Sequence, residues 1–127
     1  MPTRLDSIVF DAADHVALAR WWGEALGWPM EVEEDEAWLS APEGSFLPEL
    51  VFVPVDDPKV VKNRVHLDLA SSSLEDQAAT VDRLVAAGAL RADIGQGDVP
   101  WVVLADPEGN EFCVLASLAT LDEDGSP

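Results

Sequence analysis

The sequence has little cysteine, few basic residues and no long apolar run, and each shortage excludes a class of protein. The single cysteine, Cys113, excludes an internal disulfide and favours a reducing compartment. Only 7 Lys and Arg residues accompany 25 Asp and Glu residues, and the net charge of −18 argues against nucleic acid and anionic membrane surfaces as partners. The chain shows neither a membrane-spanning run nor a basic start followed by an apolar segment, so we expect a cytoplasmic protein without a signal peptide.

What the chain does contain is enough apolar sequence for one folded domain. Apolar residues make up 48% of its 127 residues, which predicts a globular domain with its own core. In the first half, apolar patterning and turn residues predict strands and one helix over residues 5–10, 15–26 (helix), 28–32, 37–40 and 49–55. In the second half they predict strands and one helix over residues 64–69, 74–87 (helix), 90–94, 99–105 and 110–115.

The two halves repeat the same order of elements. Each contains a strand, a helix and about three further strands, and the offset between them is roughly sixty residues. This repetition predicts an α+β fold of two βαβββ modules with two mixed sheets. We expect a single domain over residues 1–127, with modules at about 5–58 and 62–118 and a polar tail at 119–127.

Glu111 is a carboxylate just inside an apolar strand. The turn sequence at residues 106–109, Asp-Pro-Glu-Gly, precedes it, and Phe112 follows it. Burying a carboxylate costs several kcal/mol unless a cation, a metal or a hydrogen-bonding ligand pairs with it. Glu49 occupies the comparable place in the first half. Each glutamate is therefore either a candidate site residue or a strand-start residue that reaches water.

Of the two histidines, His66 is the one with a candidate role in a site. We expect His15 to be exposed at the start of a helix and to have no functional role. Strand alternation places His66 on one face with Arg64 and Asp68. That polar face either meets solvent or lines a cavity. In a cavity, a neutral imidazole beside a carboxylate suits a divalent first-row metal, and Arg64 could pair with Asp68 or hold a ligand anion.

Five tryptophans are many for this length, and each either packs in the core or contacts a ligand. Helical spacing places Trp22 on the inner face of its helix and Trp21 at the periphery. Trp38 and Trp101 belong to predicted strands, where an indole could stack on a flat or apolar ligand. We interpret Cys113 as a small core or cavity residue, because nearby acids would raise its pKa and suppress nucleophilic reactivity.

The chain resembles the vicinal oxygen chelate superfamily, which includes glyoxalase I, extradiol dioxygenases and bleomycin- or fosfomycin-resistance proteins. It is especially similar to the small bacterial glyoxalase-like domains. The resemblance covers about residues 5–118 and is carried by three segments, residues 14–28, 62–69 and 101–115. It implies the glyoxalase/bleomycin resistance/dihydroxybiphenyl dioxygenase fold, in which the two βαβββ modules form a cupped sheet.

The resemblance also implies a set of metal ligands, one on each of four strands. The matching positions here are Ser7, Glu49, His66 and Glu111, with Glu111 also the catalytic candidate. A divalent Zn, Ni, Fe or Mn ion would be the cofactor. Ser7 departs from the pattern, because a hydroxyl is a weak ligand beside imidazole or carboxylate. The cofactor could therefore be absent. Family members often pair, so a homodimer is a further expectation.

Three hypotheses about function follow from the sequence and the resemblance. The first is a metal-dependent lyase, isomerase or dioxygenase that acts on a small oxygenated substrate. The second is a metal-free protein that sequesters a drug or metabolite, with aromatic stacking and acidic groups for an aromatic or cationic compound. The third is a degenerate fold that serves as an interaction domain. In the first two, Trp38, Arg64 and Trp101 are the candidate ligand-binding residues.

Overall fold

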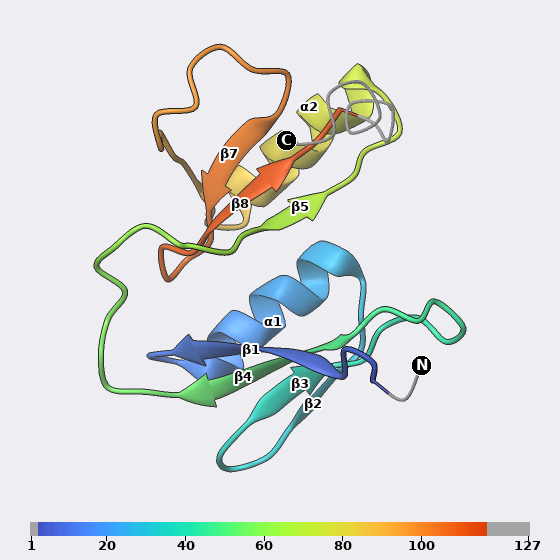
Figure 1. The fold of residues 1–127 in the computed structure, drawn as a ribbon, viewed down its shortest axis with the longest axis vertical. Coiled ribbons are helices and arrows are strands. Elements are labelled where there is room, and N and C mark those ends of the chain that lie inside the picture. The colour runs from blue at the N-terminus through green and yellow to red at the C-terminus, as the bar shows by residue number, and fades with distance from the viewer. Residues whose placement is uncertain (1–2, 117–127) are drawn as a thin grey trace. The chain divides into compact units, whose positions relative to one another are not determined.

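The computed structural model describes residues 3–116, which form two four-stranded sheets with one helix each (Figure 1). The chain divides into two compact units between Pro58 and Lys59. The predicted α+β class with two modules is confirmed. The predicted tail at 119–127 and the last residues of the second module lie outside the described residues. Among the described residues, neither helix is long and apolar enough to cross a membrane.

The first unit consists of one mixed sheet and one helix. Its elements are β1 (Ser7–Ala12), α1 (His15–Leu26), β2 (Met30–Val32), β3 (Ala37–Leu39) and β4 (Glu49–Pro54). The strand order is β1-β4-β3-β2, with β1 parallel to β4 and the other pairs antiparallel. The crossover from β1 to β4 includes α1, as a parallel pair of strands requires.

Helix α1 begins and ends where the sequence predicts. The Asp14 carboxylate accepts a hydrogen bond from the Ala17 N–H at 3.0 Å, which satisfies one of the donors left free at a helix start. Gly27 ends the helix with φ 72°, a left-handed conformation that glycine adopts without a Cβ clash. Gly23 allows close packing, because a Cβ there would lie 3.1 Å from a methyl carbon of Leu39.

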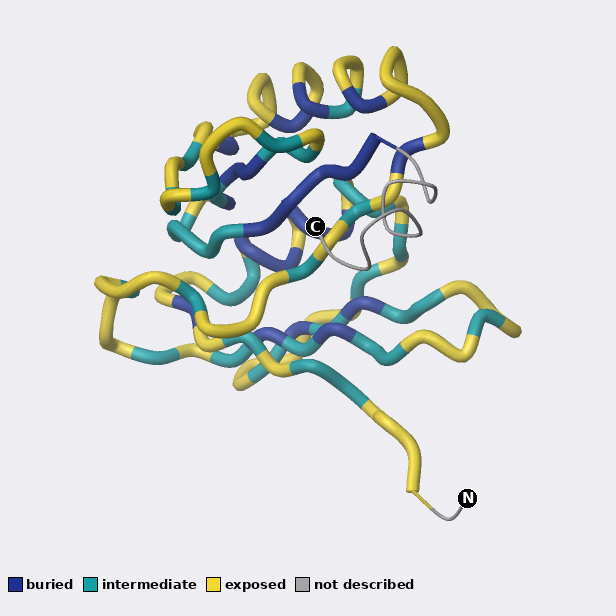
Figure 2. The backbone as a smooth tube through the Cα atoms, turned by 45° about the horizontal axis from the view of Figure 1, so that its top comes forward, coloured by how far each residue is buried: buried dark blue, intermediate teal, exposed yellow. Residues whose placement is uncertain are grey.

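The core of the first unit lies between α1 and one face of its sheet. Alternate strand residues face the helix, and Figure 2 shows buried positions alternating with intermediate ones along β3 and β4. Trp22 is buried on the inner face, as predicted. The prediction that Trp21 is peripheral is wrong, because Trp21 is also buried and packs edge-on against Trp22 with ring centroids 5.0 Å apart. His15, expected to be exposed, is half-buried.

The second unit repeats the architecture of the first. Its elements are β5 (Leu67–Leu69), α2 (Leu74–Ala86), β6 (Leu90–Arg91), β7 (Val102–Ala105) and β8 (Glu111–Val114). The strand order is β5-β8-β7-β6, with β5 parallel to β8 and the other pairs antiparallel. Strand β8 is central in this order, and Figure 2 shows it as the most continuously buried strand.

Helix α2 is anchored at its start and at one inner side chain. Ser73 caps the start of the helix, and its hydroxyl oxygen accepts from the Asp76 N–H at 3.1 Å. The buried Gln77 amide donates to the carbonyl of Pro100 at 3.0 Å and to that of Val114 at 2.9 Å. One side chain thus ties the helix both to the end of β8 and to the loop before β7.

All four strands of the second unit are shorter than predicted, and β6 covers only Leu90–Arg91 of the predicted 90–94. The strand expected over 64–69 begins at Leu67, and Asn63, just before the predicted strand, donates its N–H to the Glu111 side chain. The strand expected over 99–105 begins at Val102. Pro100 has no N–H to donate and restricts the residue before it, so regular pairing starts only after it.

The turn between β7 and β8 is confirmed. The Gly109 N–H donates to the Asp106 carbonyl at 2.8 Å, and Gly109 has φ 91°. The buried Asp106 carboxylate accepts from the N–H groups of Glu108 and Asn110 at 2.9 and 3.0 Å, and also from the Asn110 side-chain amide. These bonds hold the turn that positions Glu111 at the start of β8.

Candidate functional site

Glu111 has two strong partners within its own unit. Its Oε1 accepts from the Asn63 N–H at 2.6 Å, and its Oε2 lies 2.6 Å from the Lys59 ammonium. The Asn63 side-chain amide also donates to the Glu111 carbonyl at 3.3 Å. The partner that a carboxylate at this position requires is therefore a lysine and a backbone amide of the segment before β5.

The charge state of Glu111 follows from these contacts. Burial raises the pKa of Glu111, because only 11% of its side chain is exposed. The hydrogen bonds from Lys59 and Asn63 and the positive charge of Lys59 act in the opposite direction and prevail. The net result is a pKa of Glu111 below its usual value. Glu111 is therefore an ionised carboxylate at neutral pH, and both of its oxygens are bonded. This suits a structural ion pair better than a general base, which must be free to accept a proton.

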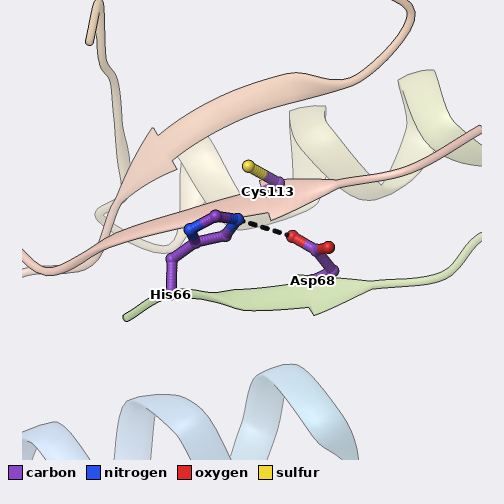
Figure 3. A group of neighbouring side chains, drawn as sticks. All are labelled: His66, Asp68 and Cys113. Atoms are coloured by element: carbon purple, nitrogen blue, oxygen red, sulfur yellow. Dashed lines mark ion pairs between the residues drawn. The ribbon is translucent and has the colours of Figure 1, made fainter. Parts of the chain in front are cut away.

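His66 is next to a different carboxylate. Its Nε2 lies 3.1 Å from Oδ1 of Asp68, which is part of β5. Asp68 is opposite Cys113 in the parallel pairing of β5 with β8. Figure 3 shows the three side chains gathered on the same side of these two strands. One donor atom from each of the three lies within 4.8 Å of the others, so this group could hold a metal ion.

The pKa values of Asp68 and Cys113 are both displaced upward. Burial raises the pKa of Asp68, and the neighbouring His66 and the Cys113 thiol only partly oppose this. Burial, followed by the negative charge of Asp68, raises the pKa of Cys113 to about 11. Cys113 is therefore a protonated thiol at neutral pH and a poor nucleophile. The sequence-based interpretation of Cys113 as a buried residue whose pKa is raised by acids is confirmed.

Ser7 and Glu49 are neighbours in the first unit. They form the first pair of the parallel ladder between β1 and β4, so both side chains lie on the face of the sheet away from α1. Both are half-buried. The corresponding first pair between β5 and β8 is Leu67 with Phe112, one residue after His66 and Glu111. The four positions thus occupy equivalent places at the starts of strands in the two units.

Trp38 lies on the same open face as Glu49. It is opposite Val51 of β4, and Val51 is in turn opposite Val9 of β1. Glu31 of β2 is opposite Trp38 on its other side. Trp38 is half-buried, and Val9 is 56% exposed. An indole, two valines and a carboxylate therefore form one row across the face that α1 does not cover.

Trp101 and Arg64, the other two predicted ligand-binding residues, have different surroundings. Trp101 precedes β7 and packs against a buried apolar cluster, so it lies outside the strand in which it was predicted. The cluster contains Val103, Cys113 and Leu115. Arg64 is exposed in the segment before β5. Because this segment is not a strand, strand alternation does not place Arg64 on the same face as His66. The structure therefore gathers Trp38 with Glu49 on one sheet face, and places Trp101 and Arg64 elsewhere in the other unit.

Sequence reasoning missed Lys59 and Asn63 as the partners of Glu111. The available signal was charge: three of the seven basic residues of this acidic chain fall within residues 59–64. A cluster of bases just before a strand, in a chain with a carboxylate at the start of the adjacent strand, indicates an ion pair. Asp68 was noted only as a possible partner of Arg64, whereas its partners are His66 and Cys113.

Comparison with known proteins identifies the family. The sequence profile of the glyoxalase-like domain family matches residues 7–115, which is most of the chain. The chain belongs to the glyoxalase-like domain family. The resemblance to the vicinal oxygen chelate superfamily is thereby confirmed. A search of curated proteins gives no significant match to this glyoxalase-like protein.

Solved structures confirm the fold of this glyoxalase-like protein. A glyoxalase/bleomycin resistance protein/dioxygenase family enzyme from Burkholderia phytofirmans PsJN is 16% identical, with a TM-score of 0.71 over 88% of this chain and 97% of its own. A glyoxalase-related enzyme from Fulvimarina pelagi is 20% identical, with a TM-score of 0.66 over 87% and 86%. The oxidase ChaP-H2 is 17% identical, with a TM-score of 0.64 over 92% and 98%. At these identities the similarity establishes the fold alone.

The residues at the four family metal positions do not fit a metal well in this glyoxalase-like protein. Ser7 offers only a weakly coordinating hydroxyl. Both oxygens of Glu111 are already engaged, one by the Lys59 ammonium and one by the Asn63 amide. A metal at Glu111 would have to displace a lysine from a 2.6 Å ion pair. His66 and Glu49 are the two remaining donors, fewer than the three protein ligands typical of a catalytic zinc site.

Proposed function

We propose that this glyoxalase-like protein binds a small molecule on the open face of its first sheet, without a metal at the family position. The observation that carries the proposal is the row formed by Val9, Val51 and Trp38. Soluble proteins usually cover such apolar rows, and an exposed one flanked by polar groups is typical of a ligand-binding surface. The largest member, Trp38, offers a flat indole surface for stacking.

The charges around this row indicate the chemical class of the ligand. Glu31 ends the row on the β2 side, and Glu49 belongs to the neighbouring row. A flat ligand that carries a positive charge would gain both the stacking interaction and the attraction of these carboxylates. The net charge of −18 adds a long-range attraction for cations and repels anions. We infer a planar aromatic cation as the ligand class.

A metal-dependent lyase, isomerase or dioxygenase is the competing function. It assigns His66, Glu111 and Glu49 as ligands of a divalent ion, with Glu111 as a base. The contacts of Glu111 with Lys59 and Asn63 weigh against it, because a base must be free to accept a proton. Family membership alone does not decide between the two, since one fold hosts many chemistries.

The test uses two planar tricyclic probes of similar size and opposite charge. In the presence of a chelator, 9-aminoacridine, a cation, should quench tryptophan fluorescence with a Kd on the order of micromolar, and anthracene-9-carboxylate should bind far more weakly. Trp38→Ala should weaken 9-aminoacridine binding at least tenfold, which corresponds to about 1.4 kcal/mol. Trp101→Phe is the matched control and should leave the Kd unchanged, because Trp101 packs in a separate apolar cluster.

Two results would reject the proposal in favour of the metal-dependent function. One is loss of probe binding when the chelator is added. The other is loss of probe binding in Glu111→Gln together with normal binding in Trp38→Ala.

Homodimer formation, which the family resemblance also predicts, is part of the proposal, because β1 and β2 are the edge strands of the first sheet. Light scattering coupled to size-exclusion chromatography measures it directly.

A further inference from the structure

We propose that His66, Asp68 and Cys113 form a binding site for a zinc-like divalent cation. This site goes beyond the proposed function, because it lies in the second unit and uses neither Trp38 nor Glu49. Asp68 and Cys113 are opposite each other on β5 and β8, so the sheet itself holds them together. His66 lies two residues before Asp68, on the same side of the strand (Figure 3).

The distances suit a tetrahedral ion. With zinc bonds of about 2.0–2.3 Å to nitrogen, oxygen and sulfur, tetrahedral geometry separates ligand atoms by about 3.5 Å. Nε2 of His66 and Oδ1 of Asp68 are 3.1 Å apart, and the Cys113 sulfur lies within 4.8 Å of one imidazole nitrogen and one carboxylate oxygen of these residues. Small side-chain rotations would bring all three into range. The fourth position would remain open to water or to a ligand oxygen, as in sites with three protein ligands.

The donor set favours a borderline-soft cation over a hard one. One imidazole nitrogen, one carboxylate oxygen and one thiolate sulfur suit Zn²⁺ and Co²⁺, whereas Mg²⁺ and Ca²⁺ prefer oxygen alone. The carboxylate and the thiolate together supply two negative charges, which neutralise the divalent ion. On binding, the ion replaces the thiol proton of Cys113, and one proton is released to solvent.

The surroundings allow an ion to enter and to be retained. His66 and Asp68 are partly exposed, with side-chain exposures of 36% and 23%, so the open side of the site faces water. Cys113 is buried among Val103 and Leu115, which forms an apolar floor under the sulfur. A metal–sulfur bond there is shielded from competing water. Without an ion, hydrogen bonds from His66 and Cys113 to Asp68 keep the same three side chains together.

Cobalt titration of the full chain tests the site. Metal-stripped protein titrated with Co²⁺ should bind one equivalent and show thiolate-to-cobalt charge-transfer absorption, which Zn²⁺ should then displace. Cys113→Ser should abolish that absorption. His66→Ala and Asp68→Asn should each weaken Co²⁺ binding at least tenfold. Asp98→Asn, an exposed loop carboxylate, is the matched control and should bind Co²⁺ as the wild type does.

Two outcomes would overturn the site. One is the absence of stoichiometric Co²⁺ binding by the wild type. The other is Co²⁺ binding that survives Cys113→Ser and Asp68→Asn but is lost in Glu49→Gln or Glu111→Gln, which would place the ion at the family position. Circular dichroism of each variant separates loss of a ligand from loss of the fold, and Asp68→Asn tests the site without altering a buried side chain. Binding of 9-aminoacridine in chelator is a separate readout, so either proposal can fail alone.

Discussion

At the scale of single residues, Asp106 carries the most hydrogen bonds in the turn that positions Glu111. Its buried carboxylate accepts from two backbone N–H groups and one side-chain amide. Asp106→Ala removes the acceptor and leaves buried donors unpaired, so we expect a loss of about 2–4 kcal/mol in the free energy of unfolding. Urea denaturation followed by circular dichroism measures it.

The control for this prediction is Asp98→Ala, which removes an exposed loop carboxylate of the same unit. We expect a change of less than about 0.5 kcal/mol for this surface substitution. Equal losses in both variants would contradict the assignment, because they would mean that the effect comes from removing negative charge and not from the hydrogen bonds of the turn.

Cys113 gives a second prediction at this scale. With a pKa of about 11 it should alkylate slowly, because only about one thiol in a thousand is ionised at pH 8. The unfolded chain, with a cysteine pKa of about 8.5, should react about two hundredfold faster. Asp68→Asn removes a negative charge that raises the pKa of Cys113, so its alkylation should accelerate several-fold over the wild type. Iodoacetamide labelling followed by mass spectrometry, in chelator, gives the rates.

Asp98→Asn is the control for the labelling experiment, since it removes the same charge away from the thiol. An Asp68→Asn rate equal to that of the wild type would show that burial alone controls the reactivity of Cys113. A low rate in every variant together with rapid labelling in urea would support the same conclusion.

Sequence reasoning about single residues succeeded where a residue's own chemistry decided its place. The predicted helix over 15–26 and the predicted turn at 106–109 depend on the local chemistry of Asp14, Gly27 and Gly109, and the structure confirms both. It failed where the decision came from residues far along the chain. One partner of Glu111 is an amide 48 residues away, and the only sequence signal for that segment was the cluster of basic residues at 59–64.

At the scale of elements, the segment before β5 is attached to β8 through one ion pair and two hydrogen bonds. Lys59→Met removes the cation and leaves the Glu111 carboxylate, whose side chain is only 11% exposed, without its charged partner. We expect a loss of about 2 kcal/mol at pH 7. Lys62→Met is the matched control and should cost little, because the hydrogen bond that Lys62 donates is 3.3 Å long and lies at an exposed position.

The pH dependence of this pair has a definite sign. The contacts with Lys59 and Asn63 hold the pKa of Glu111 below its usual value, so the stabilisation is present above the unfolded-state pKa of about 4.3 and is lost as the pH falls through the folded-state value. The stability difference between wild type and Lys59→Met should therefore shrink below about pH 4. Asp68 has a raised pKa, so its contribution to stability changes with pH in the opposite direction. This contribution is the same in both proteins and cancels from the difference. A difference that stays constant from pH 7 to pH 3 would contradict the ion pair.

Element boundaries were predictable where a cap or turn marks them and less so elsewhere. The predicted limits of α1 coincide with the observed helix, because Asp14 and Gly27 mark both ends. The start of β5 was misplaced by three residues, since the alternation of polar and apolar residues continues back to Arg64 although regular strand pairing does not. For β7, Pro100 indicated in the sequence that the strand starts later than residue 99, and the strand prediction did not take it into account.

At the scale of the whole molecule, the two-module organisation was the most predictable feature. The same order of strand, helix and three strands occurs on both sides of Pro58, and each unit has the same strand order and the same single parallel pair. The candidate site was less predictable, because its contacts depend on residues outside the four family positions. Position alone did not reveal that Lys59 neutralises Glu111 or that Asp68 is the partner of His66.

The charge of the molecule leads to the last prediction. With 25 acids and 7 bases, repulsion among carboxylates should destabilise the folded state at low ionic strength. Raising NaCl shortens the screening length from about 30 Å at 0.01 M to about 8 Å at 0.15 M, so the folded state should gain about 1 kcal/mol and the Tm should rise by about 4 °C. Choline chloride at equal ionic strength should give the same rise, because screening does not depend on the identity of the cation. A Tm that falls with salt would show instead that attractive pairs such as Lys59 with Glu111 outweigh the repulsion.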